Sequence, residues 1–427
     1  MLTRFIILLL PLLFCSSLRS QVLVFKDVQV VDVESGTIKP GQTVMVQGGI
    51  ITAVGSKVKW PAHAIIIPGT GKYLIPGLWD MHAHVAEPKR AYQWSLLLAY
   101  GVTGVRDMGG LGLEELNQSK QRIREGVLGP RIYGAGKVLD GKPAVAPEQG
   151  VEINSAEEAT LWVDQMAEGG ADFIKSYEML RPENFQALVR AARKRGLKVA
   201  GHVPLTMTVA EAAGSLHSME HLRGFDYACS PLEDSIVRLQ RHAIDTTRLD
   251  GRSIRAKLHG SRFSRAHETY DTNRATALAQ VLSSRQVFQA PTLIIGMNTL
   301  VNTRFDTTAG YKKAIQYMPD SVVQQWQGLF QPRAATEQER NIFSFRNRMV
   351  RLLKAHKVPI MAGTDVILPF LVPGYSLHQE LEMLVKAGLT PAEALQAATL
   401  TAARCLGLQD KAGAIKVGYW ADLVLLE

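Results

Sequence analysis

Apolar runs and amphipathic stretches alternate along most of this 427-residue chain, and this alternation restricts the fold more than any other feature. Between the runs lie helical patterns such as residues 181–196, where apolar residues recur at helical spacing and a glycine follows. Eight strands that alternate with helices predict a parallel (β/α)8 TIM-like barrel, whereas a doubly wound sheet usually has fewer strands. The eight runs comprise residues 73–85, 101–108, 130–139, 171–177, 197–203, 215–222, 287–295 and 358–366.

The two ends of the chain differ in character from the middle. Residues 22–70 contain short strand patterns and a hairpin turn at Gly48-Gly49, without a long helical period, and residues 413–427 have the same character. We therefore expect one small β-sandwich assembled from both termini, with the barrel between its two parts. The expected division is a sandwich of residues 21–76 and 411–427 and a metal-dependent hydrolase barrel of residues 77–410.

Two segments exceed a minimal barrel. Residues 224–285 separate the sixth and seventh strands and are rich in arginine, which predicts a solvated insert of helix and loop. Residues 297–338 follow the seventh strand, and loops in that position face the active site of a barrel. This second segment is therefore either a lid or substrate wall, or an elaboration of the surface. Its aromatic residues are Phe305, Tyr311, Tyr317, Trp326 and Phe330.

Residues 1–20 resemble a secretory signal peptide. Arg4 precedes an apolar run that ends at Phe14, and small or polar residues follow, with Ser20 close to the expected cleavage site. The run is too short for a membrane span, and no later segment is long and apolar enough for one. We expect an exported protein, periplasmic or secreted. Lipidation of Cys15 is an alternative, although the bulky Phe14 precedes it.

Charge and cysteine content are less informative. The formal net charge is +9 and the sequence pI is about 9.4, but no nucleic-acid-binding motif accompanies the excess of basic residues. We therefore expect a small-molecule substrate and no nucleic-acid partner, with contact to an anionic envelope surface as an alternative. Homo-oligomer formation stays open, as does pairing of Cys229 with Cys405; the helical pattern around Cys405 favours a buried free thiol.

Side chains suited to metal binding stand at the ends of two of the strands. In an extended strand, residues i and i+2 point the same way, so His82 and His84 can converge on one ion, and imidazole suits zinc. Lys175 ends the fourth strand, where burial would be costly unless the amine is paired or modified. Burial favours the neutral amine, which can add carbon dioxide and become a carbamate able to bridge two metals. Taken alone, a lysine that reaches solvent explains the position equally well.

The fifth, sixth and eighth strands also end in candidate ligands: His202, His221 and Asp365. Each has an ordinary explanation, since a single histidine can belong to the core and Asp365 can cap the segment that follows. An acidic residue after a mostly apolar strand needs a partner, and a metal is one. Their joint occurrence at the carboxyl ends of barrel strands, where such barrels carry out chemistry, predicts a metal centre.

These motifs together resemble the amidohydrolase superfamily, in the branch of imidazolonepropionase-like proteins and Xaa-Pro dipeptidases. The resemblance runs nearly end to end, apart from residues 224–285. It implies that His82, His84 and Asp365 bind one metal, and that carbamylated Lys175 bridges to a second held by His202 and His221. Imidazolonepropionases generally lack the lysine, so its presence favours the binuclear branch. The motifs that carry the likeness are PGLWDMHAHV, GVTGVRDMGG, GADFIKSY, AGHV, SMEH, AGTD, LHQELEMLVKAGLTPAEALQAAT and GAIKVGYWADLVLL.

The resemblance also implies a reaction. Two divalent metals, with zinc expected, would generate a bridging hydroxide that hydrolyses an amide or peptide C–N bond, and Asp365 would move the proton. Tyr177 and His378 would contact the substrate, or serve as rim packing and helix polarity. A dipeptide is one candidate substrate class. The alternatives are a mononuclear cyclic-amide hydrolase or deaminase, and a non-catalytic binding scaffold on the same fold. Arg106 and Asp107 are expected to pair with each other.

Overall fold

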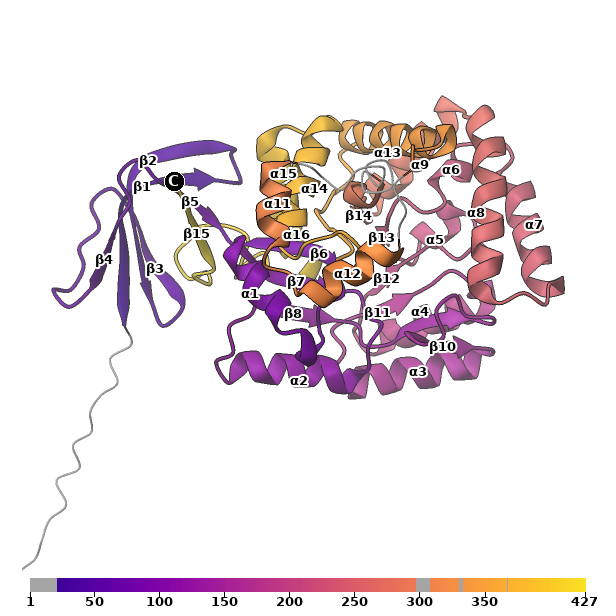
Figure 1. The fold of residues 1–427 in the computed structure, drawn as a ribbon, viewed down its shortest axis with the longest axis horizontal. Coiled ribbons are helices and arrows are strands. Elements are labelled where there is room, and N and C mark those ends of the chain that lie inside the picture. Colours follow the sequence, from indigo (N-terminus) through magenta and orange to yellow (C-terminus); the bar gives the residue numbers. More distant parts are fainter. Residues whose placement is uncertain (1–20, 297–307, 330–332, 367) are drawn as a thin grey trace, which may run out of the picture.

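The computed structural model describes residues 21–296, 308–329, 333–366 and 368–427, apart from the side chains of residues 260–265. The predicted signal peptide at residues 1–20, with Cys15, lies outside the described residues, and so do Phe305 and Phe330. Figure 1 shows two parts, a β-rich part formed by the chain termini and a larger part in which strands and helices alternate.

The larger part is the (β/α)8 barrel that the sequence predicts. Its strands are parallel, and β8 and β9 together occupy the third position, because β8 pairs with β7 and β9 pairs with β11. The eighth strand lies within residues 358–366 and closes the barrel through parallel bridges from Ile360 to Gln289 and from Val366 to Ala83. In order, the strands are β6 (Leu78–Ala83), β7 (Val102–Asp107), β8 (Arg131–Gly134), β9 (Val138–Gly141), β11 (Ile174–Ser176), β12 (Val199–Gly201), β13 (Ser218–Glu220) and β14 (Phe288–Ala290). A short strand, β10 (Gly150–Ile153), pairs with β9 outside this circuit.

The seventh strand is shorter than its apolar run suggests. Pro291 follows the last strand residue and has no N–H to donate to a ladder. Residues 293–296 are helical, and the N–H groups of Leu293 and Ile294 donate to the buried carboxylate of Glu380 at 3.0 and 2.8 Å. The apolar residues after Pro291 are thus buried in a helical turn, which hydrophobicity alone does not distinguish from a strand.

Helices surround the barrel strands, and a continuous apolar core lies between the two layers. The helices that follow the first five strands, in order, are η1 (Pro88–Arg90), α1 (Tyr92–Ala99), α2 (Leu113–Arg124), α3 (Ala156–Glu168), α4 (Pro182–Lys194) and α5 (Val209–Ala213). The segment between the sixth and seventh strands forms α6 (Phe225–Ala228), α7 (Glu233–Thr246), α8 (Gly251–Glu268) and α9 (Thr272–Ser284). The last part contributes α11 (Ala309–Ile315), α12 (Asp320–Leu329), α13 (Glu337–Ala355), α14 (Tyr375–Lys386), α15 (Pro391–Ala397) and α16 (Leu400–Leu406). Among the helices of the described residues, none combines the length and the apolar character that a membrane crossing requires.

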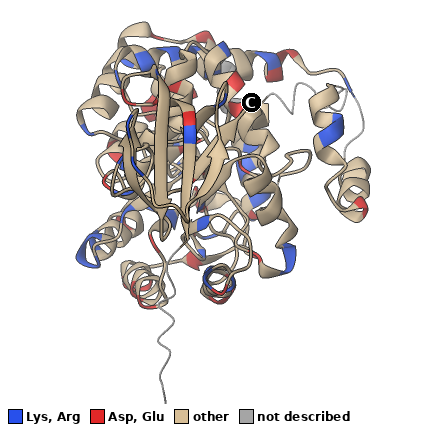
Figure 2. Cartoon of the chain, turned by 90° about the vertical axis from the view of Figure 1, so that its left-hand side faces the viewer, with Lys and Arg blue, Asp and Glu red and all other residues tan. Residues whose placement is uncertain are grey.

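The terminal part is a separate sheet that takes strands from both ends of the chain. The strand order is β15-β5-β1-β2-β3, and β4 pairs in parallel with β1. Its core is mainly apolar and includes Val28, Val44 and Leu74, each without exposed surface. Figure 2 looks onto this part, and the strands that face the viewer carry few charged residues. The strands are β1 (Val22–Asp32), β2 (Thr37–Gln47), β3 (Ile50–Gly55), β4 (Ile65–Pro68), β5 (Tyr73–Pro76) and β15 (Leu423–Leu426).

Candidate metal centre

A cavity of about 730 Å³ opens at the carboxyl ends of the barrel strands. All six predicted metal ligands line it, although they come from five separate strands of the barrel. Most of them are almost completely buried: Lys175 and His82 are each 1% exposed, and His202 is 2% exposed. The six residues are His82, His84, Lys175, His202, His221 and Asp365.

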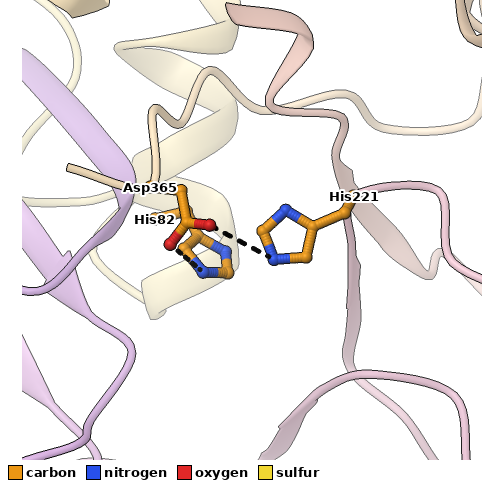
Figure 3. Close-up of side chains that lie close together, drawn as sticks. All are labelled: His82, His221 and Asp365. Atoms are coloured by element: carbon orange, nitrogen blue, oxygen red, sulfur yellow. Dashed lines mark ion pairs between the residues drawn. The ribbon is translucent and has the colours of Figure 1, made fainter. Parts of the chain in front are cut away.

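The carboxylate of Asp365 lies among three imidazoles. Its Oδ1 is 3.0 Å from Nε2 of His84 and 3.4 Å from Nε2 of His82, and its Oδ2 is 3.9 Å from Nε2 of His221. Figure 3 shows His82 and His221 facing the two oxygens of this carboxylate from different sides. The donor atoms of His82, His221 and Asp365 all lie within 4.8 Å of one another, a spacing that one metal ion can bridge.

The hydrogen bonds of the imidazoles test whether these residues fit a metal. Each Nδ1 has a protein partner: Glu220 for His82, the Gly109 carbonyl for His84, Glu178 for His202 and Thr292 for His221, at 2.6 to 2.7 Å. When Nδ1 carries the proton and donates it to an acceptor, Nε2 keeps its lone pair, as in metal-binding histidines generally. The donor set therefore fits a divalent metal.

Lys175 and His202 form the other side of the centre. The two residues lie on neighbouring strands, since Lys175 is paired with Ala200 in the β11–β12 register. The ring of Tyr177 stacks on His202 with 4.2 Å between centroids, and the Lys175 amine lies 5.7 Å from the centre of that ring. A side chain at Gly201 would clash, because its Cβ would stand 2.1 Å from the Ser176 carbonyl oxygen. Glycine before His202 thus lets the two strands approach closely.

Burial lowers the pKa values of the lysine and of two histidines, which increases the share of their neutral forms. Burial lowers the pKa of Lys175 to about 8, although the carboxylates of Glu220 and Asp365 oppose the shift. Burial, and next the charge of Lys175, lowers the pKa of His202 to about 3. Burial, together with the charge of His82, also holds the pKa of His221 well below its usual value. Neutral imidazoles and a reactive amine are the forms that metal binding and carbamate formation require.

For Asp365 and His84, interactions with neighbouring side chains outweigh the effect of burial on the pKa. Burial alone would raise the pKa of Asp365, but the charge of His82 and the close contacts with His82 and His84 hold it well below its usual value. Burial alone would lower the pKa of His84, but its interactions with Asp365 raise it. Asp365 is therefore an ionised carboxylate in the centre of the imidazoles.

Several centre residues have left-handed backbone conformations. The φ angles of His221, Thr292 and Asp365 are 61°, 47° and 63°. Residues other than glycine adopt such angles at a cost of order 1–3 kcal/mol, and they do so mainly at functional sites. The hydrogen bond between His221 and Thr292 joins two of these strained residues. The fold therefore holds these side chains in the orientation that the centre needs.

Glu220 and Glu178 contact two of the candidate ligands, and the sequence did not reveal either of them. Glu220 accepts the His82 hydrogen bond and also receives two from the guanidinium of the buried Arg106, at 2.8 and 3.0 Å. The prediction that Arg106 pairs with Asp107 is wrong, because Asp107 instead accepts backbone N–H groups, among them those of residues 85 and 86. Glu178 similarly pairs with His202, with Arg223 at 3.7 Å and with His259 at 3.2 Å. The position of Glu220 directly before His221 was the available signal, but its partners are remote in sequence.

Residues 224–285 contribute to the site, contrary to the prediction of a solvated insert. The first half of α8 lies at the cavity, where Arg252 and Arg255 line the wall. The hydroxyl of Tyr177, one of the two predicted substrate-binding residues, accepts a hydrogen bond from Arg255 at 3.4 Å. The other, His378, is not brought to the site: it is exposed on α14, and its Nε2 bonds with the Tyr100 carbonyl at 2.8 Å. The two cysteines of the described residues, Cys229 and Cys405, are buried free thiols.

Two curated relatives of this chain are imidazolonepropionases. Among curated relatives, imidazolonepropionase of Psychromonas ingrahamii (strain DSM 17664 / CCUG 51855 / 37) is 44% identical over 81 residues, which are 18% of this chain and 19% of that protein. Imidazolonepropionase of Vibrio cholerae serotype O1 (strain ATCC 39541 / Classical Ogawa 395 / O395) is 24% identical over 410 residues, 92% of this chain and 88% of that protein.

Solved structures extend the likeness to the whole fold. A bottromycin amidohydrolase has a TM-score of 0.72 and 26% identity and covers 95% of this chain and 82% of its own. A Xaa-Pro dipeptidase with bound methionine in the active site has a TM-score of 0.67 at 19% identity, over 95% and 93% of the two chains. The profile of the amidohydrolase family matches residues 73–427. This chain therefore belongs to the amidohydrolase family, and its activity is metal-dependent hydrolysis of carbon–nitrogen bonds.

Proposed function

We propose that the protein is a binuclear metal hydrolase that cleaves the amide bond of dipeptides or N-acyl amino acids. The observation that carries this proposal is the buried Lys175, which opens into the same cavity as the four imidazoles and Asp365. A lysine without a metal-related role is costly at 1% exposure. Its lowered pKa increases the share of the neutral amine, which can form a carbamate with carbon dioxide.

The residues divide into two ligand sets around this lysine. His82, His84 and Asp365 would hold one metal, His202 and His221 would hold the other, and carbamylated Lys175 would join the two. When bound, two divalent cations, with zinc expected, lower the pKa of a water between them and polarise the substrate carbonyl.

Asp365 would carry out the proton transfers of the reaction. Its carboxylate is ionised and lies 3.0 to 3.9 Å from three imidazole nitrogens, so it stands beside the reacting atoms. It would accept a proton from the attacking water and then deliver that proton to the leaving nitrogen. Glu220 and Glu178 would keep His82 and His202 in the tautomer that leaves Nε2 free.

A mononuclear cyclic-amide hydrolase or deaminase is the second candidate. One observation favours it: His82, His221 and Asp365 already provide three donors within 4.8 Å, enough for a single ion. The Vibrio cholerae relative is named imidazolonepropionase, and this name also favours the second candidate. Lys175 separates the two candidates, because a mononuclear enzyme has no use for a bridging carbamate.

The test combines metal analysis with a substrate screen. The purified protein, supplied with zinc and bicarbonate, is analysed for metal content and assayed against dipeptides, N-acyl amino acids and cyclic amides. The proposal expects two metals per chain and turnover of linear amides. One metal per chain with turnover of cyclic amides alone would support the mononuclear candidate, and absence of any amide turnover would refute both.

A further inference from the structure

The wall of the cavity is rich in arginine. Five guanidinium groups line it, whereas the described carboxylates of the wall are fewer and mostly engaged. Arg90 pairs with Glu87 at 2.8 Å, Arg252 pairs with Glu148 at 2.7 Å, and Arg223 reaches Glu178. The five arginines are Arg90, Arg223, Arg252, Arg255 and Arg346.

Two of these arginines, Arg255 and Arg346, have no described carboxylate within ion-pair distance. Among the described residues, Arg255 donates a single hydrogen bond, at 3.4 Å to the neutral Tyr177 hydroxyl. Burial lowers the pKa of Arg346 to about 10, with a further contribution from the charge of Arg223, although Asp226 and Glu380 oppose the shift. A buried guanidinium is stabilised by an anion, and a carboxylate matches its planar fork of donors. The cavity thus has positive charge to spare for a ligand.

The position of Arg255 is fixed by the packing of α8. Its neighbour Ile254 is 1% exposed and packs with Val145 and Met179 in a small apolar cluster. At the start of the helix, a Cβ at Gly251 would stand 2.3 Å from the Pro143 carbonyl oxygen, so only glycine permits this close approach. The inserted helix is therefore held against the barrel mouth, with Arg255 directed at Tyr177.

Arg255 is also close to the metal centre. The ring whose hydroxyl it contacts stacks on His202 at 4.2 Å. A group bound by the Tyr177 hydroxyl and Arg255 would therefore lie beside His202, one of the predicted metal ligands. In a dipeptide or an N-acyl amino acid, the free carboxylate is joined to the nitrogen of the scissile amide through a single carbon atom.

We infer that Arg255, with the Tyr177 hydroxyl, binds a free carboxylate of the substrate, and that Arg346 adds positive charge to the same cavity. This inference rests on the proposed function and names the residues that would recognise the free carboxylate of its substrates. Residues 224–285 then determine substrate specificity, because they supply the arginine that recognises the carboxylate.

The experiment compares acids with their carboxamides. Each dipeptide or N-acyl amino acid that is hydrolysed is assayed beside its C-terminal amide, with wild type, Arg255→Met, Arg255→Lys and Arg346→Met. Arg252→Met is the matched control, since it removes a guanidinium of the same helix that is already paired with Glu148. We expect wild type to prefer the acids. Arg255→Met should lower kcat/KM for the acids about 30-fold, mainly through KM, and leave the carboxamides nearly unchanged.

The variants should also differ in how strongly they prefer the acids over the carboxamides. Arg255→Lys should retain part of the preference, Arg346→Met should reduce it less than Arg255→Met, and Arg252→Met should keep it. Equal hydrolysis of acids and carboxamides by wild type would overturn the inference while leaving the proposed function intact. So would an equal loss on both substrate types in Arg255→Met, since that pattern indicates a structural role.

A binding measurement decides the case in which no amide is hydrolysed and the proposed function fails. The melting temperature of the zinc-loaded protein is measured with N-acetylglycine and with N-acetylglycinamide. We expect the acid alone to raise it, and Arg255→Met to abolish the rise. Absence of any difference between the two compounds would overturn the inference.

Discussion

The barrel mouth and the terminal sandwich are stabilised in different ways. The sandwich core consists of apolar side chains such as Val44 and Leu74. The barrel mouth instead buries charged and polar groups, and each imidazole there has a polar partner. An apolar core needs only shape and volume, whereas buried charges are tolerated only when they are paired. The buried groups of the mouth must therefore keep their orientation and their partners. Substitutions in the two regions should have different consequences.

The largest effect is expected for Lys175→Ala at the barrel mouth. If the lysine bridges two metals, the variant should lose one metal per chain and more than about 100-fold in kcat/KM, because even indirect partners of metal ligands cost 10–100-fold. Metal analysis and the amide assay measure both. Lys198→Ala removes an exposed lysine just before the neighbouring strand and serves as the control. Wild-type metal content and activity in Lys175→Ala would favour a mononuclear centre.

Arg106→Met should cause the next largest effect, on folding. The substitution leaves Glu220 buried and without its guanidinium partner, which costs about 3–5 kcal/mol of unfolding free energy. Denaturant unfolding monitored by circular dichroism gives this number. Arg195→Met, which breaks exposed ion pairs with Asp164 and Glu168, should change stability far less. If both variants lost the same unfolding free energy, the buried ion pair would stabilise the fold no more than the exposed pairs do.

Leu74→Ala tests how the apolar core of the sandwich contributes to stability. Leu74 has no exposed surface in the sandwich core, and its truncation should cost about 2–5 kcal/mol through lost burial and a cavity. Activity per folded molecule should stay at the wild-type level, because the sandwich contributes no side chain to the cavity among the described residues. Kinetics at a temperature well below the melting transition check this. A large fall in kcat would mean that the two regions are coupled.

Glu178→Gln should give a smaller effect, confined to metal affinity. The amide keeps the shape of the side chain but weakens its hydrogen bond with His202, so metal affinity should fall about 10–100-fold. Competition with a chelator measures that affinity. Glu183→Gln, at an exposed position on α4, is the matched control. Unchanged affinity in Glu178→Gln would indicate that His202 does not bind metal.

The same contrast explains what the sequence could predict. Period-two and helical patterns report burial, so the alternating barrel and the strand-rich termini followed from local sequence. The position of the six candidate ligands at one cavity followed from one rule, that parallel strands present their carboxyl ends at one face. His82 and His84 were the easiest, since i and i+2 in a strand share a side.

Partners that depend on long-range geometry could not be predicted in this way. Glu220 meets His82 across 138 positions of sequence, and no local pattern indicates which of many acidic residues will do so. The packing direction of α8 is likewise absent from its arginine-rich sequence, which is typical of a solvated helix. His378 was predicted to contact the substrate, but its helix directs the side chain to the Tyr100 carbonyl and not to the cavity. Such errors arise where tertiary packing sets the direction of a side chain.

The most direct test is anomalous diffraction at the zinc edge, from crystals grown with zinc and bicarbonate. The proposal predicts two peaks, one about 2 Å from ligand atoms of His82, His84 and Asp365 and the other equally close to His202 and His221. Density for a carbamate should extend from the Lys175 amine to both. A single peak beside an unmodified Lys175 would contradict the binuclear assignment.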